Sequence, residues 1–257
     1  MNYDFDKIID RSGSGDLKHE VLKERYGRDD LIALWVADMD FETPSFILDA
    51  LKHRLEHPVF GYTIEPKDYW PTVCKWIADH HGWHVEPQWL TYVPGGVKGI
   101  GMAINAFTQP GDKILIQTPV YHPFRMTIEG NNRQVVLNPL KESTDGSFYQ
   151  MDFEGLEKNI VDCKMMILCN PHNPAGRGWK KEKLERMNDI CLKHGVKVIA
   201  DEIHCELIMP GYQYTPFASI SEACRDNCVV LNSPSKSFNI AGLQIANIIC
   251  PDATLRR

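Results

Sequence analysis

The sequence contains no long apolar run, no basic stripe and no repeated or low-complexity segment. No stretch reaches the roughly 18 apolar residues that a membrane span needs. The net charge is -6, and Lys and Arg are scattered among acids, which argues against nucleic acid as a partner. The first residues, MNYDFDKIIDR, do not combine a cationic start with an apolar run. We expect a soluble, cytoplasmic protein that acts on neither a membrane nor a nucleic acid.

Closely spaced cysteine pairs are also scarce. Of the 8 cysteines, Cys224 and Cys228 are the closest pair, and no second pair lies near them in the sequence. A zinc site built on cysteine spacing is therefore the weaker interpretation. Other cysteines lie in apolar segments such as MMILCN and ANIIC. Free thiols in such segments behave as small buried hydrophobes, so we expect reduced cysteines.

The composition is that of a globular protein, with 43% hydrophobic and 24% charged residues. From about residue 90 onward, β-rich apolar runs alternate with helix-like stretches. The runs are LTYVP, KILIQT, RQVVL, KMMILCN, VKVIADE, NCVVLNS and finally LQIANIIC. This alternation predicts an α/β fold with many parallel strands and covering helices.

Helix signals differ along the chain. KKEKLERMNDICLKHG is the clearest helix, because Leu184, Met187 and Ile190 recur at helical spacing and Gly195 supplies a stop. Nearer the N-terminus, Thr43 followed by Pro44 predicts a helix start, and a second helix is expected over 67–81. We expect an N-terminal segment over 1–45 and one large domain over 46–257.

Lys236 is the strongest candidate for covalent chemistry. It lies just beyond the expected strand NCVVLNS, where the carboxyl ends of parallel strands form ligand crevices, and Ser233 and Ser235 flank it with hydroxyls that can bind a phosphate. A lysine that attacks an aldehyde needs an electron-sink cofactor, held beside it by phosphate donors and a carboxylate. Taken alone, a lysine between two serines is more often part of a surface loop.

Three polar residues after other expected strands fit the same cofactor. Asp201 in VIADEIHCE can pair with a protonated pyridine nitrogen, and His204 can contact the cofactor hydroxyl. Asn173 in NPHNPAGR is placed to donate to the ring oxygen. The competing interpretations are a strand-end aspartate that caps a turn, a histidine packed at the sheet edge, and a rigid proline turn.

A glycine pair and a tyrosine complete the candidate set. The expected strand LTYVP runs into Gly95, Gly96 and Val97 and then a helix, so backbone N–H groups at a helix start can bind an anion. Tyr121 in TPVYHPF follows another strand and can stack on a ring, although an aromatic residue flanked by prolines is often only core or loop packing.

Seven motifs in this order give the chain a family resemblance. They are WVADMDF (35–41), FGYT (60–63), PGGV (94–97), PVYHPF (119–124), NPHNPAGR (170–177), ADEIHCEL (200–207) and SPSKSFNIAGLQ (233–244). Together they resemble fold-type I pyridoxal-phosphate (PLP) enzymes of the class I/II aminotransferase superfamily. WVADMDF and DEIH make the chain most similar to the MalY/PatB cystathionine β-lyase branch.

The resemblance implies a three-layer α/β/α large domain with a mostly parallel sheet, and it assigns a role to each candidate. Lys236 becomes the lysine that links to PLP, Asp201 contacts the pyridine nitrogen, and Tyr121 stacks on the ring. The remaining assignments are Asn173 and His204 near the ring oxygen, Gly96, Val97, Ser233 and Ser235 on the phosphate, and Tyr62 on the phosphate of a neighbouring subunit. The Tyr62 assignment implies a homodimer with shared sites.

The chain departs from the family pattern at two places. Many relatives carry a basic residue on the phosphate eight positions after the lysine, where this chain has Gln244. Relatives also continue into a C-terminal small domain that supplies an arginine for the substrate carboxylate, whereas this sequence stops at Arg257. We expect a C-terminally truncated chain that lacks this domain.

The expected activity is carbon–sulfur β-lysis of cystathionine or related cysteine S-conjugates to a thiol, pyruvate and ammonia. An aminotransferase uses the same residues and differs in where the cofactor is reprotonated, so this alternative stays open. A PLP-binding or regulatory protein without turnover is the third interpretation.

Overall fold

The computed structural model describes residues 3–146 and 148–256. The chain divides into two compact units, of which the first comprises Met1–Ile64 and Pro234–Leu243 and the second comprises Glu65–Ser233 and Gln244–Arg257. The loop that carries Lys236 therefore belongs to the first unit, although the strand before it belongs to the second. The domain boundary expected after residue 45 stays a prediction.

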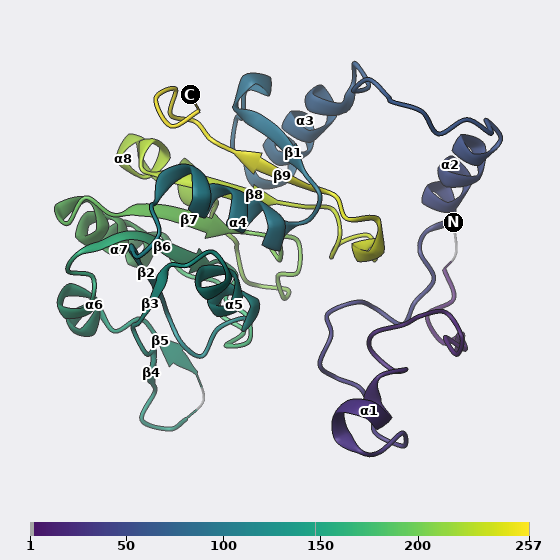
Figure 1. The fold of residues 1–257 in the computed structure, drawn as a ribbon, viewed down its shortest axis with the longest axis horizontal. Coiled ribbons are helices and arrows are strands. Elements are labelled where there is room, and N and C mark those ends of the chain that lie inside the picture. Colours follow the sequence, from purple (N-terminus) through teal and green to yellow (C-terminus); the bar gives the residue numbers. More distant parts are fainter. Residues whose placement is uncertain (1–2, 147, 257) are drawn as a thin grey trace. The chain divides into compact units, whose positions relative to one another are not determined.

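The second unit is built on a seven-stranded sheet in the order β1-β9-β8-β7-β6-β2-β3 (Figure 1). Every apolar run named from the sequence forms one of its strands, so the expected mostly parallel α/β sheet is confirmed. The strands are β1 (Leu90–Val93), β2 (Lys113–Ile116), β3 (Gln134–Leu137), β6 (Cys163–Cys169), β7 (Lys197–Asp201), β8 (Cys228–Asn232) and β9 (Ala246–Ile249). A separate pair, β4 (Lys141–Glu142) and β5 (Tyr149–Gln150), forms a small antiparallel ribbon.

The strand directions give this sheet one common edge. Strands β3, β2, β6, β7 and β8 pair in parallel, and β9 runs antiparallel to both of its neighbours, β8 and β1. Two antiparallel steps restore the direction, so β1 points the same way as β8. All strands except β9 therefore end at one edge, which we call the carboxyl edge.

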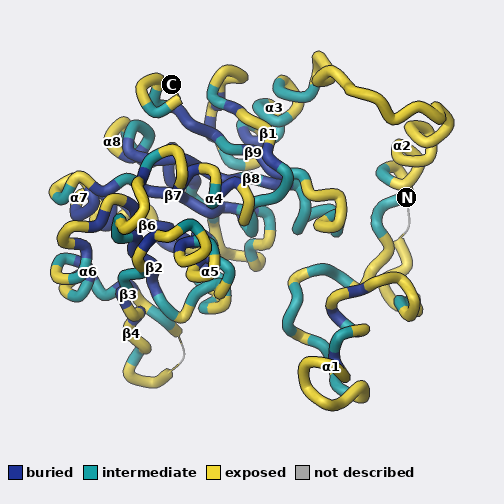
Figure 2. Tube along the Cα trace, in the orientation of Figure 1, coloured by how far each residue is buried: buried dark blue, intermediate teal, exposed yellow. Residues whose placement is uncertain are grey.

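Helices cover both faces of this sheet and complete the three layers. One face is covered by α4 and α5, whose Ile100, Ile104 and Phe124 pack on strand residues such as Ile114 and Ile199. The other face packs on side chains of α3, α6, α7 and α8. Figure 2 shows the resulting buried strands between exposed helical surfaces. The helices are α1 (Leu22–Tyr26), α2 (Ser45–Leu55), α3 (Tyr69–His81), α4 (Gly96–Phe107), α5 (Pro123–Gly130), α6 (Phe153–Asn159), α7 (Lys181–Lys193) and α8 (Glu222–Asp226), with 3-10 turns at Pro87–Trp89, Phe217–Ser219 and Ala241–Leu243.

The sequence placed both ends of α3 and α7, and the start of α2, to within two residues. Helix α2 begins at Ser45, with Pro44 before its first turn and no side-chain cap. Thr43 does not cap the helix, because Pro44 occupies the N-cap position and no side-chain cap bond forms. The Thr43 hydroxyl donates to the carbonyl oxygen of Asn239 at 3.2 Å. The eight cysteines are free thiols and all except Cys74 are buried, as expected. Among the described residues, no helix is long and apolar enough to cross a membrane.

In the first unit, hydrogen bonds fasten the WVADMDF segment to the loop that carries Lys236. The side chain of Asn239 accepts from the backbone N–H of Met39 at 2.9 Å and donates to the carbonyl oxygens of Met39 and Phe41 at 3.0 and 2.9 Å. Asn239 adopts a left-handed conformation (φ 54°), which asparagine tolerates better than most residues. The two motifs, about 200 residues apart in the sequence, thus form one local structure.

Ion pairs hold the same segment on its other side. Arg11 bridges Asp38 and Asp40, with the Arg11–Asp40 nitrogen–oxygen distance at 2.8 Å, and Lys18 contacts Asp40 at 2.7 Å. The indole of Trp35 donates to the carbonyl oxygen of Lys18 at 2.9 Å. The acidic and aromatic residues of WVADMDF therefore have structural partners within the first unit.

Close packing at Gly99 fixes α4 on the sheet. A Cβ atom at this position would lie 2.7 Å from Leu231 Cδ2 and 3.0 Å from Val93 Cγ2, closer than ordinary contact. The helix can approach β1 and β8 this closely only because position 99 has no side chain. At Gly101, on the same helix, a Cβ would lie 3.5 Å from Thr127 Cγ2, which is ordinary contact.

We predict that Gly99→Ala lowers the free energy of unfolding by about 1–3 kcal/mol, because overpacking outweighs the gain in helix propensity. Gly101→Ala is the matched control on the same helix and should stabilise by up to about 1 kcal/mol. Urea unfolding followed by circular dichroism measures both values. Equal effects of the two substitutions would contradict this account of the packing.

Candidate functional site

The carboxyl edge collects most of the residues that the sequence singled out. Each follows, ends or opens an element that meets this edge: Gly96 and Val97 open α4 after β1, Tyr121 follows β2, Asn173 follows β6, Asp201 ends β7, His204 follows it, and Ser233 follows β8. The parallel direction of the strands is the reason that residues from such distant sequence positions share one edge.

The start of α4 packs closely against the loop after β7. Gly95 precedes the helix with φ 102°, a conformation that L side chains rarely adopt. A Cβ at Gly96 would lie 2.1 Å from Ile203 Cδ1, so the first turn of α4 and the DEIH segment are in close contact. The N–H groups of this turn have no partner within the helix, and the helix dipole favours an anion there.

Tyr121 is linked to Asn173 by a backbone hydrogen bond and to Asp201 by the charge of its carboxylate. Asp201 is buried, and one of its carboxylate oxygens accepts from the N–H of Ile203 at 3.2 Å. Burial, and then the charge of Asp201, raise the pKa of the Tyr121 hydroxyl. The N–H of Tyr121 donates to the carbonyl oxygen of Asn173 at 2.9 Å, and Asn173 in turn donates its N–H to Cys169 Sγ at 3.3 Å. The backbone of Asn173 thus lies against that of Tyr121, whose hydroxyl is within reach of the Asp201 charge.

The Ser233 hydroxyl is already engaged. It donates to the carbonyl oxygen of Ile245 at 2.5 Å, and the residue is buried. A hydroxyl has one proton to donate, so a bond from Ser233 to a phosphate requires this proton to turn away from Ile245.

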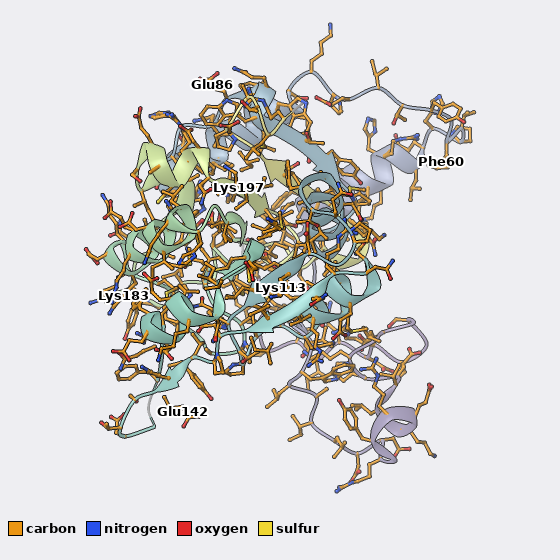
Figure 3. All side chains as sticks on the ribbon, turned by 60° about the vertical axis from the view of Figure 1, so that its left-hand side comes forward. Phe60, Glu86, Lys113, Glu142, Lys183 and Lys197 are labelled. Carbon is orange, nitrogen blue, oxygen red and sulfur yellow. The ribbon has the colours of Figure 1, made fainter. Side chains whose placement is uncertain are left out.

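Lys236, Ser235 and Tyr62 belong to the first unit, so the second unit by itself does not contain them. Lys236 lies in a tight turn, in which Phe238 donates its N–H to the Pro234 carbonyl and Ile240 to the Ser235 carbonyl, both at 3.0 Å. Tyr62 lies in the exposed segment after α2 that also contains Phe60 (Figure 3).

Three residues at the carboxyl edge escaped the sequence reasoning. Lys98, in the first turn of α4, donates from Nζ to Gln244 Oε1 at 2.7 Å. A cation therefore lies beside Gln244, the position at which many relatives carry a basic residue for the phosphate. Gln117 directly follows β2, and its amide atoms are buried with no hydrogen-bond partner among the described residues. Glu202 is fully buried next to Asp201. Only the position of Lys98 beside the PGGV motif could have drawn notice in the sequence.

Glu202 is a buried acid that ties the edge to the loop after it. Its carboxyl accepts from the Tyr214 hydroxyl and from the N–H of Phe217, the latter at 2.8 Å. Burial outweighs these hydrogen bonds and raises the pKa of Glu202 to about 8. At a pH between 4.5 and about 8, the folded chain therefore keeps a proton on Glu202 that the unfolded chain releases. The stabilisation from this proton is complete below pH 4.5, the pKa of the unfolded chain, and is lost as the pH rises toward 8.

We predict that replacing this titrating group by an amide, Glu202→Gln, flattens the pH dependence of stability between about pH 5 and about pH 8. In this window the parent loses on the order of 1 kcal/mol per pH unit through this group. Urea midpoints measured across the range test the difference. If the urea midpoints of parent and variant differed by the same amount at every pH, the result would contradict the assignment of Glu202 as a buried, protonated acid.

The carboxyl edge fits the expected PLP on its own geometry. The start of α4 suits a phosphate, Asp201 offers a buried carboxylate at the end of β7, and Tyr121 lies near enough for the charge of Asp201 to raise its pKa. The unpaired amide of Gln117 adds a buried polar group at the same edge. The chemistry of each of these residues is compatible with a ring that carries a phosphate and a basic nitrogen.

Comparison with known proteins gives consistent matches. The model of the family "Aminotransferase class I and II" matches residues 29–257. Cystathionine beta-lyase PatB of Bacillus subtilis is 46% identical over 98% of this chain and 65% of its own length. Protein MalY of Escherichia coli is 35% identical over 99% of this chain and 65% of its own length.

Solved structures agree in fold. Cystalysin from Treponema denticola, whose crystal structure contains a pyridoxal 5'-phosphate cofactor, is 40% identical with a TM-score of 0.93 over 100% of this chain and 66% of that chain. The present chain thus spans about 65% of the length of the curated relatives PatB and MalY. On these matches, the chain belongs to the aminotransferase class I and II family, in the branch that contains PatB and MalY.

Proposed function

We propose that this protein uses PLP to cleave the carbon–sulfur bond of cystathionine or a related cysteine S-conjugate, releasing a thiol, pyruvate and ammonia. The observation that carries the proposal is the grouping of Asp201, Tyr121 and the start of α4 at one edge of the parallel sheet. The similarity to PatB, named as a cystathionine beta-lyase, supports the lyase over other activities of the family.

The residues of the second unit would bind and orient the cofactor. The N–H groups of Gly96 and Val97 at the start of α4 hold the phosphate, and Asp201 keeps a proton on the pyridine nitrogen. Tyr121 stacks on the ring, while Asn173 and His204 contact the ring oxygen. When bound, PLP supplies an electron sink for negative charge that develops at the substrate α-carbon.

Lys236 would hold the cofactor covalently and move the proton. It follows Asn232, the last residue of β8, by four residues, so the chain keeps its Cα within about 14 Å of the end of β8. With its amine free, Lys236 would remove the proton from the substrate α-carbon as general base. The sulfur then leaves the β-carbon as a thiolate, and hydrolysis of the remaining three-carbon unit gives pyruvate and ammonia.

We also propose that the active form is a homodimer. Helix α2 buries none of its residues, and Val59, Phe60, Tyr62 and Ile64 in the segment after it are exposed. A second subunit would cover this apolar surface and receive Tyr62 at its phosphate.

The free cysteines favour a reducing compartment, so the expected location is the cytoplasm.

We predict that Lys236→Ala abolishes covalent trapping of PLP by borohydride and lowers pyruvate release from cystathionine by at least about 100-fold. Absorbance and mass spectrometry report the trapping independently of turnover. Lys164→Ala, an exposed lysine on β6, is the matched control and should leave both readouts unchanged. Pyruvate release at the parent rate in Lys236→Ala would contradict the assignment of this lysine.

The products distinguish the lyase from its two alternatives. Release of thiol and pyruvate in equal amounts supports the proposal. A keto acid of unchanged carbon skeleton, formed together with stoichiometric pyridoxamine phosphate, would identify an aminotransferase. Trapped PLP without turnover of any amino acid would identify a binding or regulatory protein.

Lys98 should contribute the phosphate charge that Gln244 does not provide. We predict that Lys98→Gln weakens PLP binding about tenfold, which corresponds to about 1.4 kcal/mol, and that Lys98→Arg restores it. Equilibrium dialysis against PLP measures the affinity. Equal affinities of Lys98→Gln and the parent would show that backbone and hydroxyl groups suffice.

A further inference from the structure

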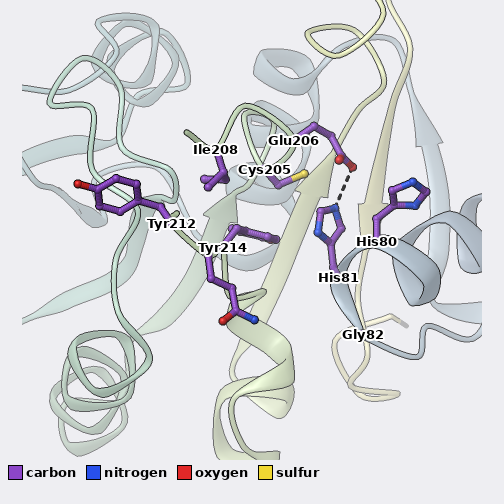
Figure 4. Close-up of a pocket in the computed structure, with 9 residues that line it drawn as sticks. His80, His81, Gly82, Cys205, Glu206, Ile208, Tyr212 and Tyr214 are labelled. Atoms are coloured by element: carbon purple, nitrogen blue, oxygen red, sulfur yellow. Dashed lines mark hydrogen bonds and ion pairs between the residues drawn. The ribbon is translucent and has the colours of Figure 1, made fainter. Parts of the chain in front are cut away.

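A cavity of about 440 Å³ lies in the second unit beside three side chains that are common metal ligands: His81, Cys205 and Glu206 (Figure 4). His81 is the last residue of α3, whereas Cys205 and Glu206 lie in the segment after β7. Their ligand atoms all lie within 4.8 Å of one another. The Nε2 atom of His81 and the Oε1 atom of Glu206 are 2.8 Å apart.

We propose that His81, Cys205 and Glu206 form a binding site for a divalent metal ion of borderline softness, with Zn²⁺ as the best match. An imidazole nitrogen, a thiolate and a carboxylate are the three donor types that proteins use for this ion. Three protein ligands leave a fourth tetrahedral position, which water from the adjoining cavity can fill. The proposal does not depend on the proposed lyase activity.

The distances allow such a site after a small movement. In a tetrahedral site with bonds of about 2.0 Å to nitrogen and oxygen and about 2.3 Å to sulfur, ligand atoms lie about 3.3–3.6 Å apart. The His81–Glu206 pair must open from 2.8 Å, and the remaining separations, which are at most 4.8 Å, must settle into the same range. Changes of about 1 Å are within the reach of side-chain rotation.

A second layer of hydrogen bonds orients these ligands. The indole nitrogen of Trp76 donates to Glu206 Oε1 at 2.7 Å, and the side-chain amide of Asn232 donates to Cys205 Sγ at 3.5 Å. Second-layer bonds of this kind accompany metal ligands and strengthen metal binding. In addition, the carboxyl-terminal end of α3, a helix of 13 residues, carries partial negative charge that favours a cation beside His81.

This cluster could not be found from sequence spacing, because His81 precedes Cys205 and Glu206 by more than 120 residues. The metal would join α3 to the segment after β7. Cys205 directly follows His204, and Asn232 directly precedes Ser233, so an ion held here would also stiffen two segments that carry proposed cofactor ligands.

Cobalt is the appropriate probe, because a Co²⁺–thiolate bond gives near-ultraviolet charge-transfer absorption and a four-coordinate ion gives intense visible bands. We predict that the purified chain binds one equivalent of Co²⁺ with both signals and that Zn²⁺ displaces it. Cys205→Ser should lose the charge-transfer band, and His81→Gln and Glu206→Gln should each bind at least tenfold more weakly. Trp76→Phe should weaken binding by about 10- to 100-fold.

Cys74→Ser and His84→Gln are the matched controls, since they remove a thiol on α3 and an imidazole just after it that lie outside the cluster. Both should bind Co²⁺ as the parent does. Circular dichroism establishes that each variant is folded, and if Cys205→Ser fails to fold, His81→Gln and Glu206→Gln decide the question. Absence of binding, binding without a thiolate band, or unchanged affinity in these variants would overturn the proposal.

Discussion

Burial of both faces of the central sheet is the constraint on which the rest of the structure depends. Alternate residues along β2, β6, β7 and β8 belong to two separate apolar clusters, one under α4 and α5 and the other under α3, α6, α7 and α8. Polar groups in such strands have no place on either face, so they collect where the strands end. Because all strands except β9 end at one edge, that edge gathers an acid, an amide, an aromatic ring and a helix start.

The two units divide the proposed chemistry between them. The second unit holds the groups that suit the phosphate and the ring, and the first unit holds Lys236 in a loop that Asn239 fastens to the WVADMDF segment. The family motifs therefore have two physical roles. Some residues are proposed to hold the cofactor. Others have structural partners: Met39 and Phe41 bond to Asn239 in the loop of the lysine. Trp35, Asp38 and Asp40 hold the segment to Lys18 and Arg11.

Local sequence patterns predicted the helices and strands well, but they did not predict contacts between residues far apart in the sequence. Apolar runs and strand direction suffice to place Asp201 and Tyr121 at one edge, because parallel strands leave little freedom. The bond from the Thr43 hydroxyl to Asn239, far away in the sequence, is one such contact. Likewise, the Lys98–Gln244 pair and the buried acid Glu202 depend on contacts that no local pattern encodes.

The central claim is that the carboxyl edge holds the phosphate of PLP at the start of α4. Phosphorus NMR of the chain mixed with one equivalent of PLP, recorded across the pH range in which free PLP titrates, tests it most directly. A phosphate held by the α4 N–H groups stays a dianion, so the account predicts a chemical shift that does not change with pH. A shift that titrates like that of free PLP would contradict it.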